Sequence, residues 1–472
     1  MEKFNEIVSE IDGYVWGIPL IVMIMFCGLL LTIRVGLLQI RKLGLALKYM
    51  FKDEEGGSGE VSGFQALCTA LSATVGTGNI VGVATALCAG GPGALLWMEI
   101  AAFLGMATKY AEGLLAIKYR RKDQNGNMLG GPFYYIESGM GEKWKWLAKL
   151  FALFGVLAGL MGIGTITQIN GITSAANGFF DPNSTHTVNI FGTDYTYTTI
   201  IAGIIITIFA ALIIIGGIKR IATVSEVVVP AMIIIYVGSC LLIIFTHLAD
   251  IPDAVSQIVK GAFGVRPLAG GLTGFAVMKV SMRSGVARGI FSNEAGLGSA
   301  PIAAAAARTS EPVRQGLVTM TGTFIDTILV CTMTGLSIVM AGSHEKGLEG
   351  VAVTTDAFRC GLPFPERVSA FMLMCCLAVF AFTTILGWNY YSERCLSYLT
   401  GSKKSVTAVY KWVYIAFVFI GPYLTVEAVW NLADIFNGLM ALPNIIAIAF
   451  LSGAVSKETK DYFKRLKEKK SA

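Results

Sequence analysis

The residues best suited to chemistry are six consecutive positions, Thr74-Val75-Gly76-Thr77-Gly78-Asn79, inside a small and apolar stretch at 66–88. Glycines interrupt helices, and a break inside hydrocarbon frees N–H and C=O groups that no water satisfies. The freed N–H groups begin the outer half-helix and carry its positive dipole end, which suits a carboxylate. The freed C=O groups at the end of the inner half-helix suit a cation. One break therefore offers sites for an anion and a cation, the charge pattern of a zwitterionic amino acid plus a metal ion.

A second pair of polar residues, Thr383 and Thr384, interrupts a run that is otherwise apolar from 375 to 386. Hydroxyl and carbonyl oxygens are hard ligands, which suit sodium. Trp388 lies one helical turn beyond Thr384 and on the same face. Taken alone, the threonines are better explained by a bond to the carbonyl four residues earlier, and Trp388 could equally be an interfacial anchor.

Gln168 and Asn170 are also polar residues inside an apolar segment, at 148–178. Because amide side chains are costly in lipid, both should face the interior of a helix bundle. Gln168 either contacts a substrate or joins two helices.

The composition indicates a membrane protein: 54% of the 472 residues are hydrophobic and only 14% are charged. A soluble domain carries about 25% charged residues. The net charge of +6 is spread over short runs between apolar segments, which argues against nucleic acid as a partner. The nine cysteines include no CxxC pair, so neither a disulfide framework nor a metal site is expected.

Eleven stretches are long and apolar enough to span a bilayer, which takes about 20 residues each. They lie at 14–33, 64–88, 93–117, 148–178, 197–217, 227–247, 271–299, 315–341, 367–391, 408–428 and 433–454.

Lysine and arginine favour alternate connections between these spans, beginning with the first, at 34–62. The positive-inside rule then places the N-terminus outside the cell membrane and the C-terminus in the cytoplasm.

The seventh span is the second segment that contains helix breakers, namely Gly285, Gly289, Gly296, Gly298 and Pro301. It crosses the membrane in the opposite direction to the second span, so the two segments are the first helices of two inverted halves. Small residues also serve close helix packing, but paired interruptions in inverted halves favour a transporter's binding site.

We therefore divide the chain into four parts: an accessory helix and linker at 1–62, a first five-helix half at 63–250, a second, inverted half at 251–454, and a basic cytoplasmic tail at 455–472.

Five segments in sequence order resemble the alanine or glycine:cation symporter family, and the likeness covers nearly the whole chain. They are "SATVGTGNIVGVATA" (72–86), "GGPGALLWMEIAAFLGMATKYAE" (90–112), "GGPFYYIE" (130–137), "GVARGIFSNEAGLGSAPIAAAA" (285–306) and "FAFTTILGWNYYSER" (380–394). The resemblance implies an all-α polytopic membrane protein with a leucine-transporter-type inverted five-plus-five core and one additional N-terminal helix.

The resemblance also implies site residues. The substrate would contact Thr74, Gly76, Thr77, Gly78, Asn79, Gln168, Phe275, Met278, Thr384 and Trp388. Sodium would be bound by oxygens of Ser72, Val75, Phe380, Thr383 and Thr384.

We expect a secondary active symporter that imports L-alanine or glycine with sodium by alternating access, with D-alanine as an open alternative. Sodium is the coupling ion, no cofactor is expected, and neither nucleic acid nor an obligate protein partner is indicated. Proton coupling and a preference for glutamine remain alternatives. An intramembrane enzyme is disfavoured because the sequence contains no HExxH, GxSxG or cofactor motif. A channel is disfavoured because repeated polar pore elements are absent from the sequence.

Overall fold

The fold is known from a computed structural model, which describes residues 2–52, 54, 56–122, 128–190, 193–264, 274–424 and 426–471. Helices form nearly all of the regular structure in these residues. Two short antiparallel ladders lie between helices. β1 (Arg121–Lys122) pairs with β2 (Met128–Leu129), and β3 (Thr187–Ile190) pairs with β4 (Thr193–Thr196).

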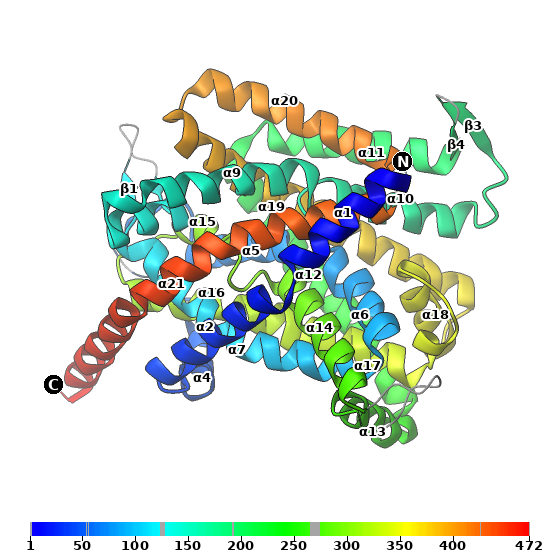
Figure 1. The fold of residues 1–472 in the computed structure, drawn as a ribbon, viewed down its shortest axis with the longest axis horizontal. Helices are drawn as coiled ribbons and strands as arrows, with labels where there is room; N and C mark the ends of the chain where they lie inside the picture. The colour runs from blue at the N-terminus through cyan, green and yellow to red at the C-terminus, as the bar shows by residue number, and fades with distance from the viewer. Residues whose placement is uncertain are drawn as a thin grey trace.

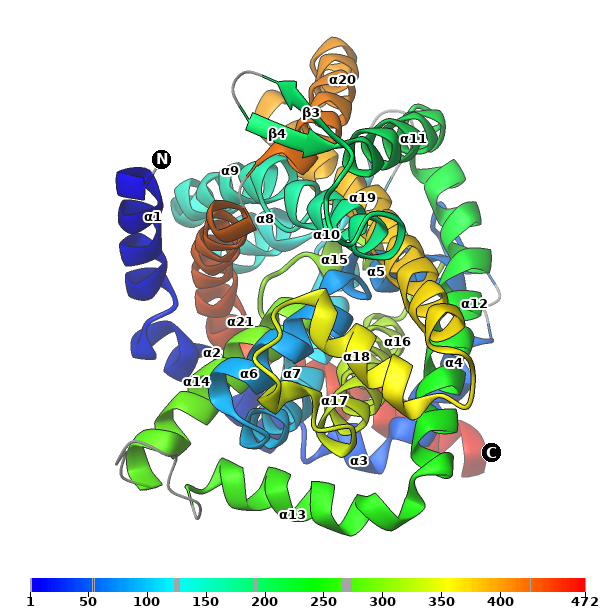
Figure 2. The same ribbon diagram turned by 90° about the vertical axis from the view of Figure 1, so that its right-hand side faces the viewer.

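Four helices precede the core: α1 (Glu2–Val15), α2 (Ile18–Arg34), α3 (Leu38–Arg41) and α4 (Leu43–Met50). A proline in the first turn of α2, where no backbone donor is needed, suits a helix start. The Trp16 indole N–H donates to the carbonyl of Asp434 at 2.7 Å, which ties this segment to the last helix. Figure 2 shows α1 standing at the rim of the bundle, outside the central helices.

The first half begins with a broken segment: α5 (Gly63–Thr74), a π-helical turn at Gly78–Gly82, and α6 (Val83–Gly90), with a bend of 52°. Ser62 and Gln65 cap the start of α5 reciprocally, which satisfies two of its free N–H groups. The remaining elements are α7 (Gly93–Lys118), α8 (Pro132–Tyr135), a π-helical turn (Ile136–Met140), a 3-10 turn (Glu142–Trp144), α9 (Lys145–Met161), α10 (Ile166–Phe180), α11 (Tyr197–Ile214), α12 (Gly217–Thr246), a 3-10 turn (Leu248–Asp250) and α13 (Ile251–Ala262).

The second half also begins with a broken segment, α14 (Gly274–Asn293) followed by α15 (Ala300–Ala304). The elements that follow are α16 (Pro312–Thr323), a π-helical stretch (Phe324–Cys331), α17 (Thr332–Met340), a 3-10 turn (Ser343–Glu345), α18 (Val351–Gly361), α19 (Glu366–Thr400), α20 (Lys404–Ile420), a 3-10 turn (Gly421–Tyr423) and α21 (Val426–Ser471). Figure 1 shows α5 and α19 inside the bundle, with α11 and α20 along one side.

The predicted number of eleven spans is not confirmed. Within the described residues, nine helices are long and apolar enough to cross a membrane, and the bent segment from Gly63 to Gly90 makes up to ten. The predicted span at 271–299 corresponds to α14 and to the non-helical residues 294–299 that follow it, while 271–273 lie outside the described residues. Helix α14 is too polar to count among the nine helices that could cross a membrane, because it contains three basic residues, Lys279, Arg283 and Arg288.

The structure adds detail to two further segments. The predicted span at 148–178 is interrupted between α9 and α10, at residues 162–165. Helix α21 continues to Ser471, so the segment predicted as a basic tail at 455–472 is helical through that residue.

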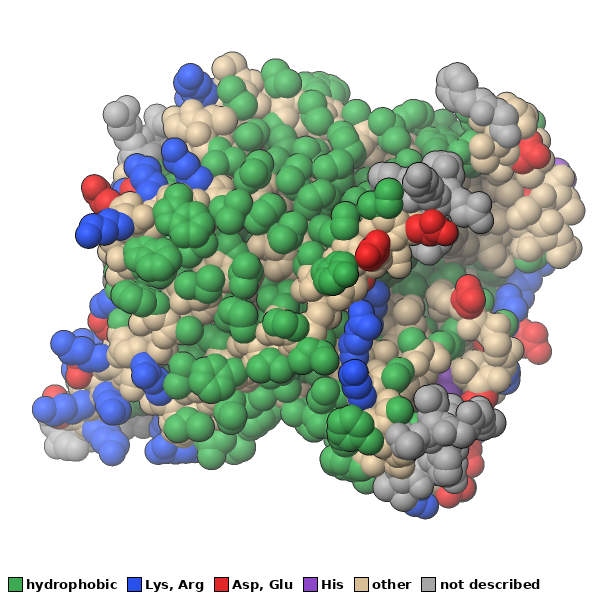
Figure 3. Space-filling model, in the orientation of Figure 1, with side chains coloured by type: hydrophobic (Ala, Val, Ile, Leu, Met, Phe, Trp, Pro, Cys, Tyr) green, Lys and Arg blue, Asp and Glu red, His purple; other side chains and the backbone are tan. Residues whose placement is uncertain are grey.

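The outer surface has the distribution expected of a membrane protein. Figure 3 shows a broad hydrophobic face over the middle of the molecule, with lysine and arginine gathered at the end that carries the C-terminus. Exposed apolar side chains are frequent on α11, for example Ile201, Ile208 and Leu212, each more than half exposed. Such a belt suits contact with lipid chains.

Candidate substrate and ion site

The centre of the molecule contains the predicted break between α5 and α6. Helix α5 ends at Thr74, Val75 is extended (φ −77°, ψ 94°), and helical structure resumes at Gly78. The Gly76 N–H donates to Asn79 Oδ1 at 2.9 Å, and the Thr77 N–H donates to Gln168 Oε1 at 3.2 Å. The freed backbone groups therefore face polar side chains and not lipid, as a break inside a membrane requires.

Close approach of other helices explains the two glycines in the break. A Cβ at Gly76 would overlap the Thr384 hydroxyl and lie 3.0 Å from Gln168 Oε1. A Cβ at Gly78 would lie 3.2 Å from the Cα of Ser292 on α14. Three other helices therefore pack directly against the backbone of the break, because it carries no side chain at these positions.

Oxygen atoms surround the carbonyl of Val75. The Thr384 hydroxyl lies 3.4 Å from this carbonyl oxygen and 3.1 Å from the carbonyl oxygen of Phe380. The neighbouring Thr383 hydroxyl lies 2.9 Å from the same Phe380 oxygen. Ser72, Thr383 and Thr384 are buried. Neutral hydroxyl and carbonyl oxygens from α5 and α19 are thereby gathered in one place, a ligand set that suits a hard monovalent cation.

One hydroxyl in the break is buried without a protein partner. Thr77 is fully buried, and its Oγ1 has no hydrogen-bond partner in the described part of the chain. Buried polar atoms in native proteins are almost always hydrogen-bonded, so an orphaned one indicates a missing ligand or water.

Asp326, in the π-helical stretch after α16, holds the break in place through hydrogen bonds. Its Oδ1 accepts a hydrogen bond from Asn79 Nδ2 at 2.8 Å. Its Oδ2 accepts from the hydroxyls of Ser292 and Thr327, both at 2.8 Å. Three donors on one buried carboxylate satisfy a charge that would otherwise be costly inside the protein.

The second break, between α14 and α15, is held by another buried carboxylate. Gly296 and Gly298 have positive φ values, and their N–H groups donate to Glu112 Oε1 at 3.1 and 3.2 Å. Asn444 Nδ2 donates to the same oxygen at 2.8 Å. A side chain of this protein thus fills the anion position that the second break creates.

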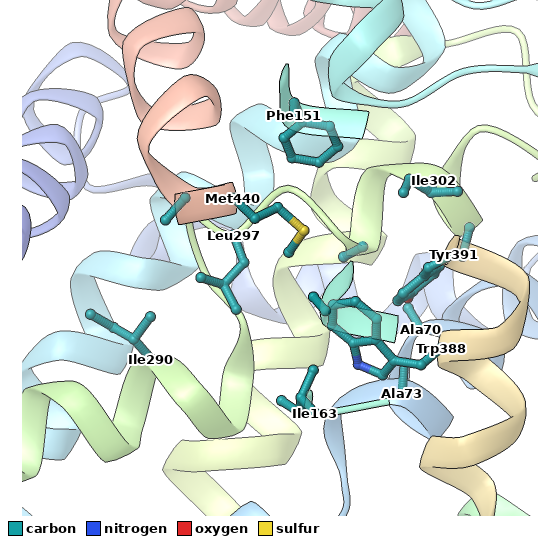
Figure 4. Close-up of a cluster of buried hydrophobic side chains, with 14 of the residues drawn as sticks. Ala70, Ala73, Phe151, Ile163, Ile290, Leu297, Ile302, Trp388, Tyr391 and Met440 are labelled. Carbon is teal, nitrogen blue, oxygen red and sulfur yellow. The ribbon is translucent and has the colours of Figure 1, made fainter. Parts of the chain in front are cut away.

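Glu294 joins the second break to α19. Its Oε1 accepts a hydrogen bond from the Trp388 indole at 2.8 Å, and its Oε2 accepts one from the Ser299 hydroxyl. Buried Lys109 interacts electrostatically with Glu112, Glu294 and Asp326. Figure 4 shows Trp388 and Tyr391 projecting from α19 toward Ala70 and Ala73.

Helix α18 covers the break between α5 and α6, on the side opposite to Trp388 and Glu294. The Thr354 hydroxyl donates to the carbonyl of Ile80 at 3.1 Å, in the π-helical turn that follows the break. The residues of the break are buried beneath these contacts.

The family model described as the sodium:alanine symporter family matches residues 1–472. The chain belongs to the sodium:alanine symporter family. It is 43% identical over 467 residues to the sodium/alanine symporter AgcS of Methanococcus maripaludis, which covers 97% of this chain and 97% of that protein. It is 38% identical to the "Probable sodium/glutamine symporter GlnT" of Bacillus subtilis, over 98% of this chain and 91% of that protein.

The fold is that of the leucine-transporter type. The crystal structure of MhsT in complex with L-phenylalanine matches 86% of this chain and 99% of its own, with a TM-score of 0.55 and 12% identity. The chain is therefore a multi-pass membrane symporter and belongs to a family of transporters.

The structure of this symporter brings most of the predicted site residues together. Gly76 to Asn79, Gln168 and Thr384 meet at the break, next to Val75, Phe380 and Thr383. Thr74 closes α5, and its hydroxyl bonds to the carbonyls of Ala70 and Leu71. Trp388 is buried, contacts Glu294, and would meet a Cβ placed at Gly164.

Phe275 and Met278 lie elsewhere, contrary to the expectation that they wall the pocket. Phe275 is at the start of α14 with 72% of its surface exposed, and Met278 is one turn further along. The residues of α14 that contact Gly78 are Phe291 and Ser292. Phe291 lies 16 residues beyond Phe275, which is roughly 24 Å along a helix.

Sequence reasoning did not select Ser292, Phe291 or Glu294 as binding residues. Nothing in the sequence distinguishes Ser292 from other serines, because its partner Asp326 lies 34 positions away. The signal that could have found all three was the run at 291–294, because it directly precedes the glycines with positive φ at 296 and 298.

Proposed function

We propose that this symporter imports alanine, and also glycine, into the cell together with sodium, by alternating access to the site at the break of α5 and α6. The observation that carries this proposal is the set of polar groups gathered there: two backbone N–H groups, the unpartnered Thr77 hydroxyl, and the Val75 carbonyl beside Thr384. These groups match the carboxylate of an amino acid and a cation.

The substrate carboxylate would lie at the start of the outer half-helix. The Thr77 N–H donates to Gln168 Oε1, and the Thr77 hydroxyl has no partner among the described residues. A carboxylate that replaces Gln168 Oε1 at this N–H would gain charge-assisted hydrogen bonds and the favourable helix dipole. The Gln168 amide would then be available to the substrate.

Sodium would lie between α5 and α19. The carbonyls of Val75 and Phe380 already lie beside the Thr384 hydroxyl, which can rotate so that its lone pairs face the ion. The carbonyl of Ser72 and the hydroxyl of Thr383 would complete the ligand set. Because the ion would hold the broken helix against α19, its binding would order the amino-acid site, which couples the two binding events.

The size of the substrate would be limited by aromatic residues. Phe291 is buried beside Gly78, and its ring centroid is 5.2 Å from that of Trp430. Trp388 covers the break from the side of α19. Side chains of this size beside the break would leave room for glycine and both enantiomers of alanine, and would disfavour larger substrate side chains by steric exclusion.

We place the protein in the cell membrane with its N-terminus outside and its C-terminus in the cytoplasm. Arg34, Arg41 and Lys42 and the C-terminal part of α21 then lie on the cytoplasmic side. In this orientation α18 covers the site from outside, and the contact between Trp388 and Glu294 covers it from inside. Alternate opening of the two covers, with 63–250 and 251–454 acting as inverted halves, would move the substrate inward.

The test is uptake of labelled alanine into proteoliposomes with an imposed inward sodium gradient. Accumulation that requires sodium, and that a potassium gradient of equal size does not support, is the expected result. Uptake that ignores sodium and follows a pH gradient would overturn sodium coupling in favour of proton coupling. Competition by unlabelled glycine, D-alanine and glutamine then ranks the substrates, and the relation to GlnT makes glutamine the main rival.

A further inference from the structure

A large cavity lies far from the transport site, between the end of α2, α3 and the last turns of α21. Its volume is about 690 Å³. A second cavity of about 360 Å³ adjoins it and shares Arg34, Ser456 and Lys460. We refer to the first cavity as the basic pocket. No step of transport described above uses it.

Positive charge dominates the basic pocket. Six basic residues line it: Arg34, Arg41, Lys42, Lys460, Lys464 and Lys467. Among the described residues, no carboxylate forms a salt bridge with the first five. Arg34 donates to the Ser452 hydroxyl at 2.7 Å, and Arg41 donates to the carbonyl of Gly36 at 3.2 Å. Both arginines therefore bond to neutral partners, and the positive field remains available to an anion.

The wall of the basic pocket is apolar and continues along α2. Ile33 and Phe463 both line the pocket, and the Lys42 ammonium lies 4.8 Å from the centre of the Phe463 ring. On α2, Val22, Phe26, Leu29 and Ile33 are 55%, 61%, 46% and 69% exposed. Their spacing of three or four residues places them in one stripe along the helix. The stripe runs from the hydrophobic belt to the pocket.

We propose that the basic pocket binds the headgroup of an anionic phospholipid of the cytoplasmic leaflet, with an acyl chain along the α2 stripe. The phosphate would supply the negative charge that the arginines and lysines are not paired with. The stripe would supply an apolar surface for the acyl chain. Basic pockets between membrane helices at the cytoplasmic side recognise anionic lipids in this way. The proposal rests on the orientation given above, which places this end of the molecule at the inner membrane surface.

The test is native mass spectrometry of the purified full chain in detergent, titrated separately with phosphatidylglycerol and phosphatidylcholine. The pocket variant carries Arg41→Gln, Lys42→Gln, Lys460→Gln and Lys464→Gln. The control variant removes four exposed charges from the same side at other helices, by Lys219→Gln, Arg220→Gln, Lys403→Gln and Lys404→Gln. Sodium-dependent alanine uptake shows that each variant is folded.

Phosphatidylglycerol should bind the wild type and the control alike, and the pocket variant at least about tenfold more weakly. Equal binding of phosphatidylcholine, or an equal loss in the control variant, would overturn the proposal. Displacement of phosphatidylglycerol by free glycerol phosphate at similar concentration would also overturn it, because the site would then hold a soluble anion. If the fourfold variant does not fold, Lys42→Gln and Lys464→Gln are measured singly, and each should weaken binding about threefold.

Discussion

Asn79 bonds directly to Asp326: its Nδ2 donates to the aspartate Oδ1 at 2.8 Å and to the Asp326 carbonyl at 3.0 Å. The other end of the same amide accepts the Gly76 N–H at 2.9 Å. One side chain thus connects the break in the first half to the π-helical stretch of the second half. Asp326 acts on the substrate site as a positioning residue, through Asn79.

Replacement of Asn79 by Asp should lower the rate of sodium-driven alanine uptake at least about tenfold, because it sets two carboxylates at hydrogen-bond distance in a buried site. The exchange Asn79→Asp with Asp326→Asn should recover part of the loss, since it swaps the side-chain donor and acceptor but leaves the Asp326 carbonyl without the Asn79 donor. Uptake by the two single variants and the double variant completes the cycle. A double variant no better than either single one would contradict the link.

Replacement of Thr384 by Val removes the hydroxyl beside the Val75 carbonyl and keeps the shape of the side chain. Loss of one ligand to a charged species costs about 1.5–3 kcal/mol, which corresponds to roughly 10–150-fold in sodium affinity. The sodium concentration for half-maximal alanine uptake should rise accordingly, with much of the rate recovered at saturating sodium.

Thr207→Val is the matched control for this change, because within the described part of the chain its hydroxyl bonds only to the Gly203 carbonyl on α11. It should leave the sodium dependence unchanged. Equal shifts of the half-maximal sodium concentration in the two variants would show that Thr384 is not a ligand of the ion.

Replacement of Gly76 by Ala should weaken alanine binding about tenfold or more, because the added methyl overlaps the Thr384 hydroxyl and crowds Gln168. Overpacking of this kind costs about 1–3 kcal/mol. The measurement is sodium-dependent binding of labelled alanine to purified protein. Gly82→Ala, in the same broken segment, has open space around the new methyl and should bind like the wild type. Similar losses in both would mean that any change in this segment disturbs it.

Phe291 and not Phe275 should govern the size of the accepted amino acid. Phe291→Leu enlarges the space beside Gly78, so competition by glutamine against alanine uptake should strengthen about fivefold. Phe275→Leu should leave the competition panel unchanged, because Phe275 is mostly exposed. The reverse outcome would restore the assignment made from the family resemblance.

The first break could be predicted from the sequence, but the register of the second could not. Gly76 and Asn79 interrupt an apolar segment at its centre, where helix breakers have an obvious meaning. In the second segment the sequence predicts helix breakers at Gly285 and Gly289 together with Gly296 and Gly298, yet α14 continues past the first two to Asn293. A Cβ at Gly285 would overlap the Ala94 carbonyl, and one at Gly289 would lie 3.0 Å from Met98. These two glycines allow close packing against α7, and sequence alone does not separate that use from a break.

Long-range partners were the other limit of sequence analysis. The role of Asp326 depends on Asn79 and Ser292, and that of Glu294 on Trp388, pairs that are 34 to 247 positions apart. The interruption between α9 and α10 was also missed, although Gly162 and Gly164 lie in it, because glycines in an apolar stretch equally suit close helix packing.

The most direct measurement of the central claim is an experimental structure of the symporter with alanine and sodium, at a resolution that separates the two. We predict the alanine carboxylate at the N–H and hydroxyl of Thr77, and the ion between the Val75 carbonyl and the hydroxyls of Thr383 and Thr384. Alanine bound away from the break of α5 and α6, or an ion without contact to Val75 and Thr384, would contradict the account.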